Sequence, residues 1–120
     1  MKKLMFAIVF LLLTNVNAYA RDFSGSWQVV ANGYLMVLNI TQDGSSITGT
    51  FDTYNPGETT PYHTGEITGD VDDEIITFTR WLGSQYQQYQ GIYLSNGISG
   101  KFSANGSSNY PWSWTAVKKP

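Results

Sequence analysis

Alternating apolar and polar residues form short runs along most of the chain, and turn-forming residues separate these runs. The clearest example is the stretch 32–52, in which an apolar run meets an Asp-Gly pair and is followed by Ile47, Gly49 and Phe51 at every second position. Alternation with a period of two is typical of a β-strand with one buried face, and Asp-Gly between two such runs indicates a tight turn. The stretch therefore predicts a β-hairpin.

The same pattern continues to residue 117 and predicts eight strands, at 24–31, 34–41, 46–52, 63–69, 74–81, 85–94, 98–104 and 111–117. Most connections between them are short and contain Gly or Asn-Gly, which favours pairing between strands that are neighbours in sequence. We therefore predict an all-β fold, an eight-stranded antiparallel up-and-down barrel in one domain spanning residues 21–120. An open sandwich of two sheets is the structural alternative.

Residues 1–20 have the pattern of an export signal, and we interpret them as a signal peptide. Two lysines precede an apolar core at 4–13, and Ala18-Tyr19-Ala20 provides small residues for cleavage. A membrane-spanning helix needs about 20 apolar residues, so this core is too short for an anchor. We expect cleavage after Ala20 and a mature protein in the periplasm or outside the cell.

Composition and charge exclude several classes of partner. The chain has no cysteine, so an exported form must be stable without disulfides. Two of the seven basic residues lie within 1–20, so the mature chain has five basic and nine acidic side chains and a net charge of −4. These charges are scattered, without a basic patch or a basic amphipathic helix, which argues against nucleic acids and membrane surfaces as partners.

Large rings occupy positions where they would fill or line a barrel. Trp27 follows small residues at the start of the first strand, and we expect it to plug one barrel end. Trp112 and Trp114 share one face of the last strand and would either form a floor or stack on a planar ligand. The predicted strand at 74–81 alternates Ile76 and Phe78 with Ile75, Thr77, Thr79 and Trp81, so which of its faces points inward stays undecided.

Amide side chains on the predicted strand at 85–94 indicate a polar region of the lumen. Gln85, Gln87 and Tyr89 have the parity of one face, where an ordinary core would carry aliphatic residues. Buried amides need hydrogen-bond partners, which water or a polar ligand would supply. In the alternative, the two glutamines lie at an open rim and face solvent.

Few patterns indicate catalysis or metal binding. The chain has no Gly-x-Ser-x-Gly motif and a single histidine, His63, which we interpret as a solvated or singly hydrogen-bonded side chain. The acidic stretch 70–74 lacks the glycine and distal glutamate of a calcium loop, so we interpret it as a solvated turn. A carboxylate pair such as Glu66 and Asp70 is the remaining catalytic alternative. We predict no cofactor and no enzymatic activity.

Three motifs support a resemblance to a known family: Ser24-Gly25-Ser26-Trp27, Asp43-Gly44 followed by the strand at 47–51, and Gln90-Gly91-Ile92-Tyr93. They resemble, in turn, the opening Gly-x-Trp motif, the second hairpin and the sixth strand of the avidin and streptavidin group of secreted barrels. Lipocalin-like barrels share parts of these motifs. The resemblance covers most of the mature chain and implies a barrel that binds a small molecule and often forms tetramers.

Position by position, the resemblance keeps the aromatic residues of the biotin site and loses the polar ones. Val29 stands where the family has an asparagine that binds the ureido group, and Phe51 stands where it has a tyrosine. Tyr89 and Phe102 correspond to tryptophans, and Gln87 to a threonine. Each donor lost from a buried ureido group costs roughly 1 to 3 kcal/mol. The resemblance therefore implies a ligand other than tightly bound biotin.

We predict an exported, non-enzymatic binding barrel for a small, partly aromatic or sugar-like ligand, with a site formed by Phe51, Trp81, Gln87, Tyr89, Phe102 and Trp112. The alternative is a protein-interaction module, or an inhibitor of an extracellular hydrolase, that acts through the polar loop at 53–63. Leu35 and Val37, on the outer face of the second strand, either contact another subunit of a homo-oligomer or lie under a loop.

Overall fold

The structure is a computed structural model that describes residues 20–31 and 33–120. Its eight strands are β1 (Gly25–Ala31), β2 (Tyr34–Asp43), β3 (Ser46–Thr53), β4 (His63–Asp72), β5 (Ile75–Leu82), β6 (Gln85–Leu94), β7 (Gly97–Ala104) and β8 (Trp112–Lys118). All eight predicted strands are confirmed. The largest difference in bounds is at the end of β4, which continues to Asp72.

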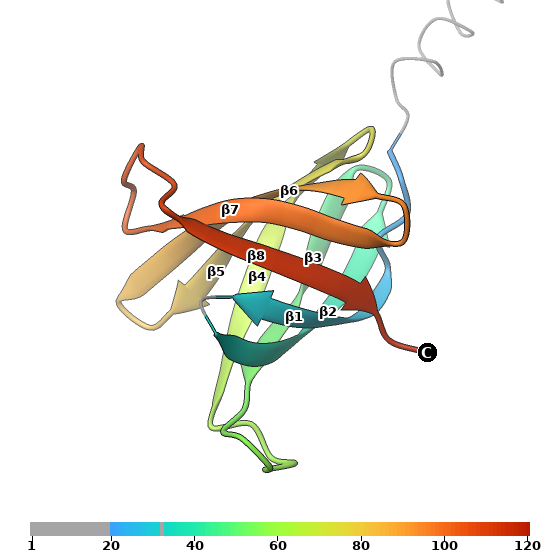
Figure 1. Ribbon diagram of the computed structural model, residues 1–120. Coiled ribbons are helices and arrows are strands. Elements are labelled where there is room, and N and C mark those ends of the chain that lie inside the picture. The colour runs from blue at the N-terminus through green and yellow to red at the C-terminus, as the bar shows by residue number, and fades with distance from the viewer. Residues whose placement is uncertain (1–19, 32) are drawn as a thin grey trace, which may run out of the picture.

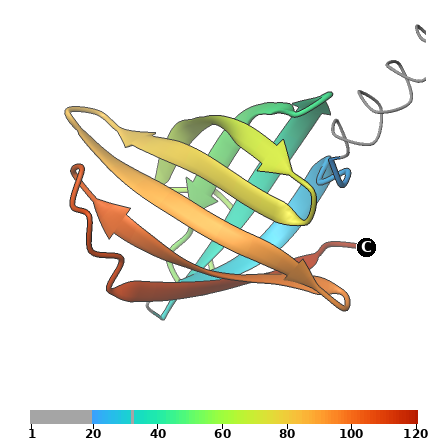
Figure 2. The same ribbon diagram turned by 90° about the horizontal axis from the view of Figure 1, so that it is seen from above.

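The strands form one closed barrel. Each strand pairs antiparallel with the next, and β8 pairs with β1 to complete the ring. Figures 1 and 2 show the strands wrapped around a common axis and strongly tilted to it. The predicted up-and-down barrel is confirmed, and the sandwich alternative is wrong.

The alternation of residue types explains which side chains face the interior. In β1, Trp27, Val29 and Ala31 are buried, whereas the residues between them are exposed. The predicted hairpin at 32–52 forms β2 and β3, and Gly44 in its turn has φ 64°, a left-handed conformation that glycine adopts without strain.

One barrel end is filled by the segment that precedes β1. Phe23 is fully buried, with its ring centroid 6.1 Å from that of Trp27 and 6.2 Å from that of Tyr93. Trp27 donates its indole N–H to the carbonyl oxygen of Phe23 at 2.8 Å, and Gln42 accepts a hydrogen bond from the backbone N–H of Phe23 at 2.8 Å. The prediction that Trp27 plugs one end is confirmed, and Phe23 completes the plug.

Trp114 fills the barrel interior above this plug. Its ring occupies space left by glycines on two neighbouring strands, because a Cβ atom at Gly91 would lie 2.7 Å from Cζ2 of Trp114 and one at Gly100 would lie 2.7 Å from Nε1. The indole N–H donates to the carbonyl oxygens of Gln90 and Lys101 at 3.0 and 3.2 Å. Of the two roles predicted for it, forming a floor or stacking on a ligand, Trp114 has the first.

The predicted signal peptide lies outside the described residues, except for its last residue. Ala20 forms an isolated parallel bridge with Asp73, whose carbonyl oxygen accepts a hydrogen bond from the backbone N–H of Arg21 at 2.9 Å. The described part of the chain contains no helix that is long and apolar enough to cross a membrane.

Candidate ligand-binding site

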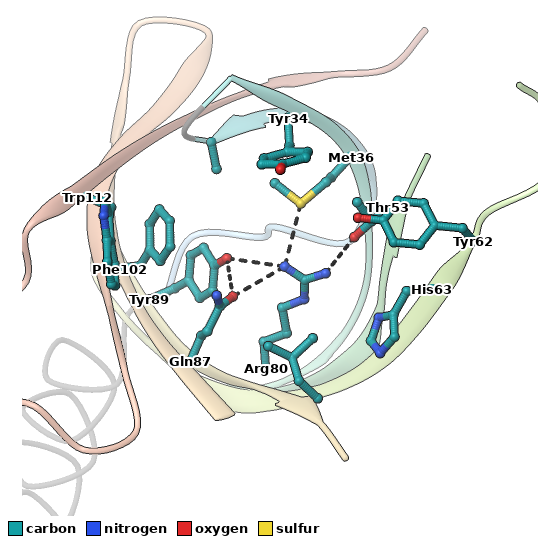
Figure 3. A pocket seen from close by; sticks show the side chains of 12 residues that line it. Tyr34, Met36, Thr53, Tyr62, His63, Arg80, Gln87, Tyr89, Phe102 and Trp112 are labelled. Carbon is teal, nitrogen blue, oxygen red and sulfur yellow. Dashed lines mark hydrogen bonds between the residues drawn. The ribbon is translucent and has the colours of Figure 1, made fainter. Parts of the chain in front are cut away.

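The barrel end opposite the plug has longer connections and is hollow. Two of the four connections at this end, at 54–62 and 105–111, are long, whereas all the connections between consecutive strands at the plugged end are short turns. A cavity of about 440 Å³ opens here, and every strand contributes at least one residue to it. The lining residues are Ala31, Tyr34, Met36, Thr53, Tyr62, His63, Arg80, Leu82, Gln87, Tyr89, Phe102 and Trp112 (Figure 3).

Arg80 extends its guanidinium group into the middle of the cavity (Figure 3) and is only 6% exposed. Its Nη2 atom donates to the hydroxyl of Thr53 at 2.6 Å. Its Nη1 atom donates to the carbonyl oxygen of Gln87 at 3.3 Å and to the hydroxyl of Tyr89 at 3.5 Å. The guanidinium carbon also lies 4.3 Å from the ring centroid of Phe51, and this cation–π contact stabilises the charge.

The acceptors around Arg80 carry no negative charge. They include the sulfur of Met36, 3.5 Å from Nη1, in addition to hydroxyl and amide oxygens. Within the described residues the one ion pair joins Arg21 to Glu74 near the plugged end. The Nε atom of Arg80 is buried and has no hydrogen-bond partner among the described residues. A buried charge without a counter-charge costs folding free energy, so this arrangement is typical of a functional site rather than of a core.

Tyr89 links Arg80 to the wall of the cavity. Its hydroxyl donates to the carbonyl oxygen of Gln87 at 2.8 Å. Burial raises the pKa of Tyr89 above its ordinary value of 10.0, and the nearby charge and hydrogen bond of Arg80 partly oppose this rise. The hydroxyl is therefore neutral at physiological pH and holds the amide of Gln87 in place.

Four rings form a row across β5 to β8, at positions that are directly paired in the sheet. The rings of Phe78 and Tyr89 stack at 4.8 Å, and those of Tyr89 and Phe102 at 4.7 Å. Trp112 continues the row at 5.4 Å from Phe102 and is 38% exposed at the mouth of the cavity. The row therefore runs from the buried core to solvent along one wall.

The facing wall consists of more polar side chains near the rim. Figure 3 shows Tyr62 and His63 across the cavity from Phe102 and Trp112. Tyr62 is exposed, whereas the Nδ1 atom of His63 is buried and has no hydrogen-bond partner among the described residues. His63 thus lines the cavity, a position that its isolated occurrence in the sequence did not indicate. The described residues contain no group of three side chains suited to hold a metal ion.

The structure brings together four of the six predicted site residues. Gln87, Tyr89, Phe102 and Trp112 all line the cavity. Phe51 is fully buried and contacts Arg80 from below rather than lining the cavity. Trp81 lies on the outer surface of the barrel, 46% exposed, with its ring 5.7 Å from that of Tyr86.

The placement of Trp81 in the cavity wall is therefore wrong, because the face of β5 that carries Trp81 points outward. Ile76, Phe78 and Arg80 are the buried residues of β5, and Arg80 pairs directly with Gln87 of β6. The signal in the sequence was the spacing, since Arg80 follows two apolar residues at steps of two. The general rule that charged side chains face solvent concealed it.

The loop at 54–62 projects from the barrel beside the outer face of β2 (Figure 1). Residues 55–60 are exposed. A surface groove lies between the loop and β2, with Leu35 and Val37 on one side and Tyr54 and Pro56 on the other. Leu35 remains 49% exposed. The apolar outer face of β2 thus lies next to this loop and is only partly covered by it.

Taken together, a closed eight-stranded barrel that is filled at one end and hollow at the other has the architecture of small-molecule-binding barrels. Among solved structures, the chain is similar to shwanavidin. A low-affinity shwanavidin mutant matches with a TM-score of 0.58 at 18% identity, over 84% of this chain and 100% of that one. Apo shwanavidin matches with a TM-score of 0.58 at 19% identity, over 83% and 100%. The fold is therefore avidin-like, as the sequence motifs indicated.

A third similar structure is a shwanavidin mutant in complex with biotin, with a TM-score of 0.55, 19% identity and coverage of 82% of this chain and 100% of that one. No protein-family model matches the chain, and no curated protein matches it. At these identities the comparison establishes the fold alone.

Proposed function

We propose that the protein is an exported, non-enzymatic barrel that binds a small, partly aromatic molecule in its open end. The observation that carries this proposal is the convergence of Arg80, Gln87 and Thr53 on a hollow with a wall of stacked rings. A volume of about 440 Å³ is within the range of ligand pockets, and a few oriented polar groups in an apolar cavity are typical of such sites. Sugar-like molecules that stack on Trp112 belong in the same test.

The ligand that we propose is not tightly bound biotin. Val29 and Phe51 stand where the avidin group has polar contacts to the ureido ring, and both are fully buried and apolar. Their neighbourhood offers the ureido oxygen no donor from these two positions, and each missing bond costs about 1 to 3 kcal/mol. Biotin therefore serves as a reference compound in the binding test.

The test is a titration of the mature protein, followed by calorimetry and tryptophan fluorescence, with biotin, oligosaccharides and flat aromatic metabolites. We expect at least one compound to bind with a 1:1 stoichiometry. Trp112→Ala should weaken its binding at least fivefold, because the ring forms the mouth of the cavity. Trp81→Ala is the matched control, since this tryptophan is similarly exposed but lies outside the cavity. Equal effects of the two substitutions would contradict the proposed site.

A protein-interaction module remains the second candidate, because the loop at 54–62 projects from the barrel with most of its residues exposed. Replacement of residues 55–60 by a short Gly-Ser turn keeps Tyr62 and His63 of the cavity. If this variant retains ligand binding, the loop is not part of the binding function. If it instead loses inhibition of a secreted glycosidase or protease that the parent protein inhibits, the second candidate is correct.

The proposal that the protein is exported can be tested through the predicted cleavage after Ala20. A chain that begins at Arg21 would keep the hydrogen bond from the backbone N–H of Arg21 to Asp73 and would keep Phe23 in the plug. N-terminal sequencing of the protein secreted by a bacterial host should begin at Arg21. A protein that keeps residues 1–20 would contradict the assignment.

A further inference from the structure

The positive charge of Arg80 has no counter-charge in the cavity, and this indicates the charge of the ligand. None of the residues that line the cavity is an aspartate or glutamate. A guanidinium group keeps its positive charge in proteins, so it cannot relieve the cost of burial by losing a proton. An anionic ligand would provide the missing negative charge and would offset the free-energy cost of burying Arg80.

The hydrogen bonds of Arg80 leave donor capacity for such a ligand. The contacts of Nη1 to the oxygens of Gln87 and Tyr89 are long at 3.3 and 3.5 Å, whereas N–H groups reach carboxylates at about 2.7 to 2.9 Å. Its third contact is to the sulfur of Met36, which is a weak acceptor. Within the described residues Gln87 is held through its carbonyl oxygen, so its amide N–H groups can donate to a second ligand oxygen. A planar head group with two oxygens fits these donors.

The size of the charge favours a monoanion. Arg80 contributes one positive charge, and the other groups that contact it are neutral. A phosphate monoester would bring nearly two negative charges, of which one would stay unpaired in a buried site. Beyond the head group, the stacked rings of Tyr89, Phe102 and Trp112 provide a flat wall for the rest of the molecule.

We infer that the ligand is a small carboxylate with a flat apolar body, which enters with its carboxylate toward Arg80 and lies along Phe102 and Trp112. This inference rests on the proposed function, since it specifies the ligand of the same cavity. It assigns Arg80 as the residue that determines specificity for charge.

The experiment compares three naphthalenes, the isosteric pair 2-naphthoate and 2-naphthamide and the larger 2-naphthyl phosphate, by calorimetry and tryptophan fluorescence at pH 7. We expect naphthoate to bind at least tenfold more tightly than naphthamide, because only the carboxylate pairs with the guanidinium. Arg80→Met should remove this preference by weakening naphthoate at least tenfold while leaving naphthamide within about threefold. Trp81→Ala should change neither affinity.

The outcomes separate this inference from the proposed function. If naphthamide binds as tightly as naphthoate, and Trp112→Ala weakens both, the cavity is a binding site but the charge assignment is wrong. If naphthyl phosphate binds more tightly than naphthoate, the assignment to a carboxylate is overturned. If a neutral compound of the larger panel binds while naphthoate does not, the inference also fails. If no compound binds at all, both this inference and the proposed function fail. The comparison of compounds on the parent protein does not depend on the folding of any variant.

Discussion

The two ends of the barrel each hold an arginine against an aromatic ring, and they use it differently. At the plugged end Arg21 lies 3.9 Å above the ring of Tyr93 and pairs with the carboxylate of Glu74. At the open end Arg80 lies 4.3 Å from the ring of Phe51 and contacts only neutral acceptors. Arg21 is partly exposed and satisfied within the chain, whereas Arg80 is buried and is not.

The two ends also differ in how far side chains fill them. At the plugged end a residue from outside the sheet, Phe23, enters the barrel and packs on Trp27. At the open end the long connections stay at the rim, and the space between Arg80 and Trp112 is hollow. The same strands thus enclose a packed core at one end and, at the other, a hollow that contains a buried charge without a counter-charge. Three changes test this division of roles.

The largest effect is expected from emptying the plug. Phe23→Ala should lower the free energy of unfolding by about 3 to 5 kcal/mol, the usual cost of removing a fully buried phenyl ring. Trp112→Ala, at the open end, should cost only about 1 kcal/mol, because that ring is partly exposed and chiefly loses its contact with Phe102. Urea denaturation without ligand measures both values. Similar costs for the two substitutions would show that the ends are not divided in this way.

A smaller effect of opposite sign is expected at Arg80. Without ligand, Arg80→Met should raise the free energy of unfolding by about 1 kcal/mol, because it removes a buried charge that has no counter-charge and keeps an apolar side chain over Phe51. Arg21→Met is the control and should lower it by no more than about 1 kcal/mol, since a partly exposed ion pair contributes little. A clear loss of stability in Arg80→Met would mean that this arginine serves the fold.

The smallest effect concerns alkaline pH. Burial raises the pKa of Tyr89, so the folded protein binds this proton more tightly than the unfolded chain does. The resulting stabilisation is complete below the ordinary value of 10.0 and is lost as the pH rises from there through the folded-state pKa. Denaturation at pH 9 and at pH 11 should therefore show a larger loss in the parent protein than in Tyr89→Phe. The variant also controls for the other tyrosines, which titrate in both proteins.

Much of the site was already predictable from strand periodicity. The parity of β6 placed Gln87 and Tyr89 together on the inner face, and the barrel prediction then placed Phe102 and Trp112 beside them. The glutamine that seemed out of place in a core is held there by Arg80 and Tyr89. Its neighbour Gln85 is exposed at the rim, which was the alternative interpretation for both amides.

The sequence by itself determined the eight strands, their order and the antiparallel barrel, because alternation and turn residues act locally and short connections leave few topologies. The tertiary structure alone decided which face of β5 points inward. Both faces of that strand carry apolar residues, so local pattern does not choose between Arg80 and Trp81. The direct pairing of Arg80 with Gln87 on the neighbouring strand β6 places Arg80 on the inner face, so a positive charge lies where sequence rules would put an aromatic ring.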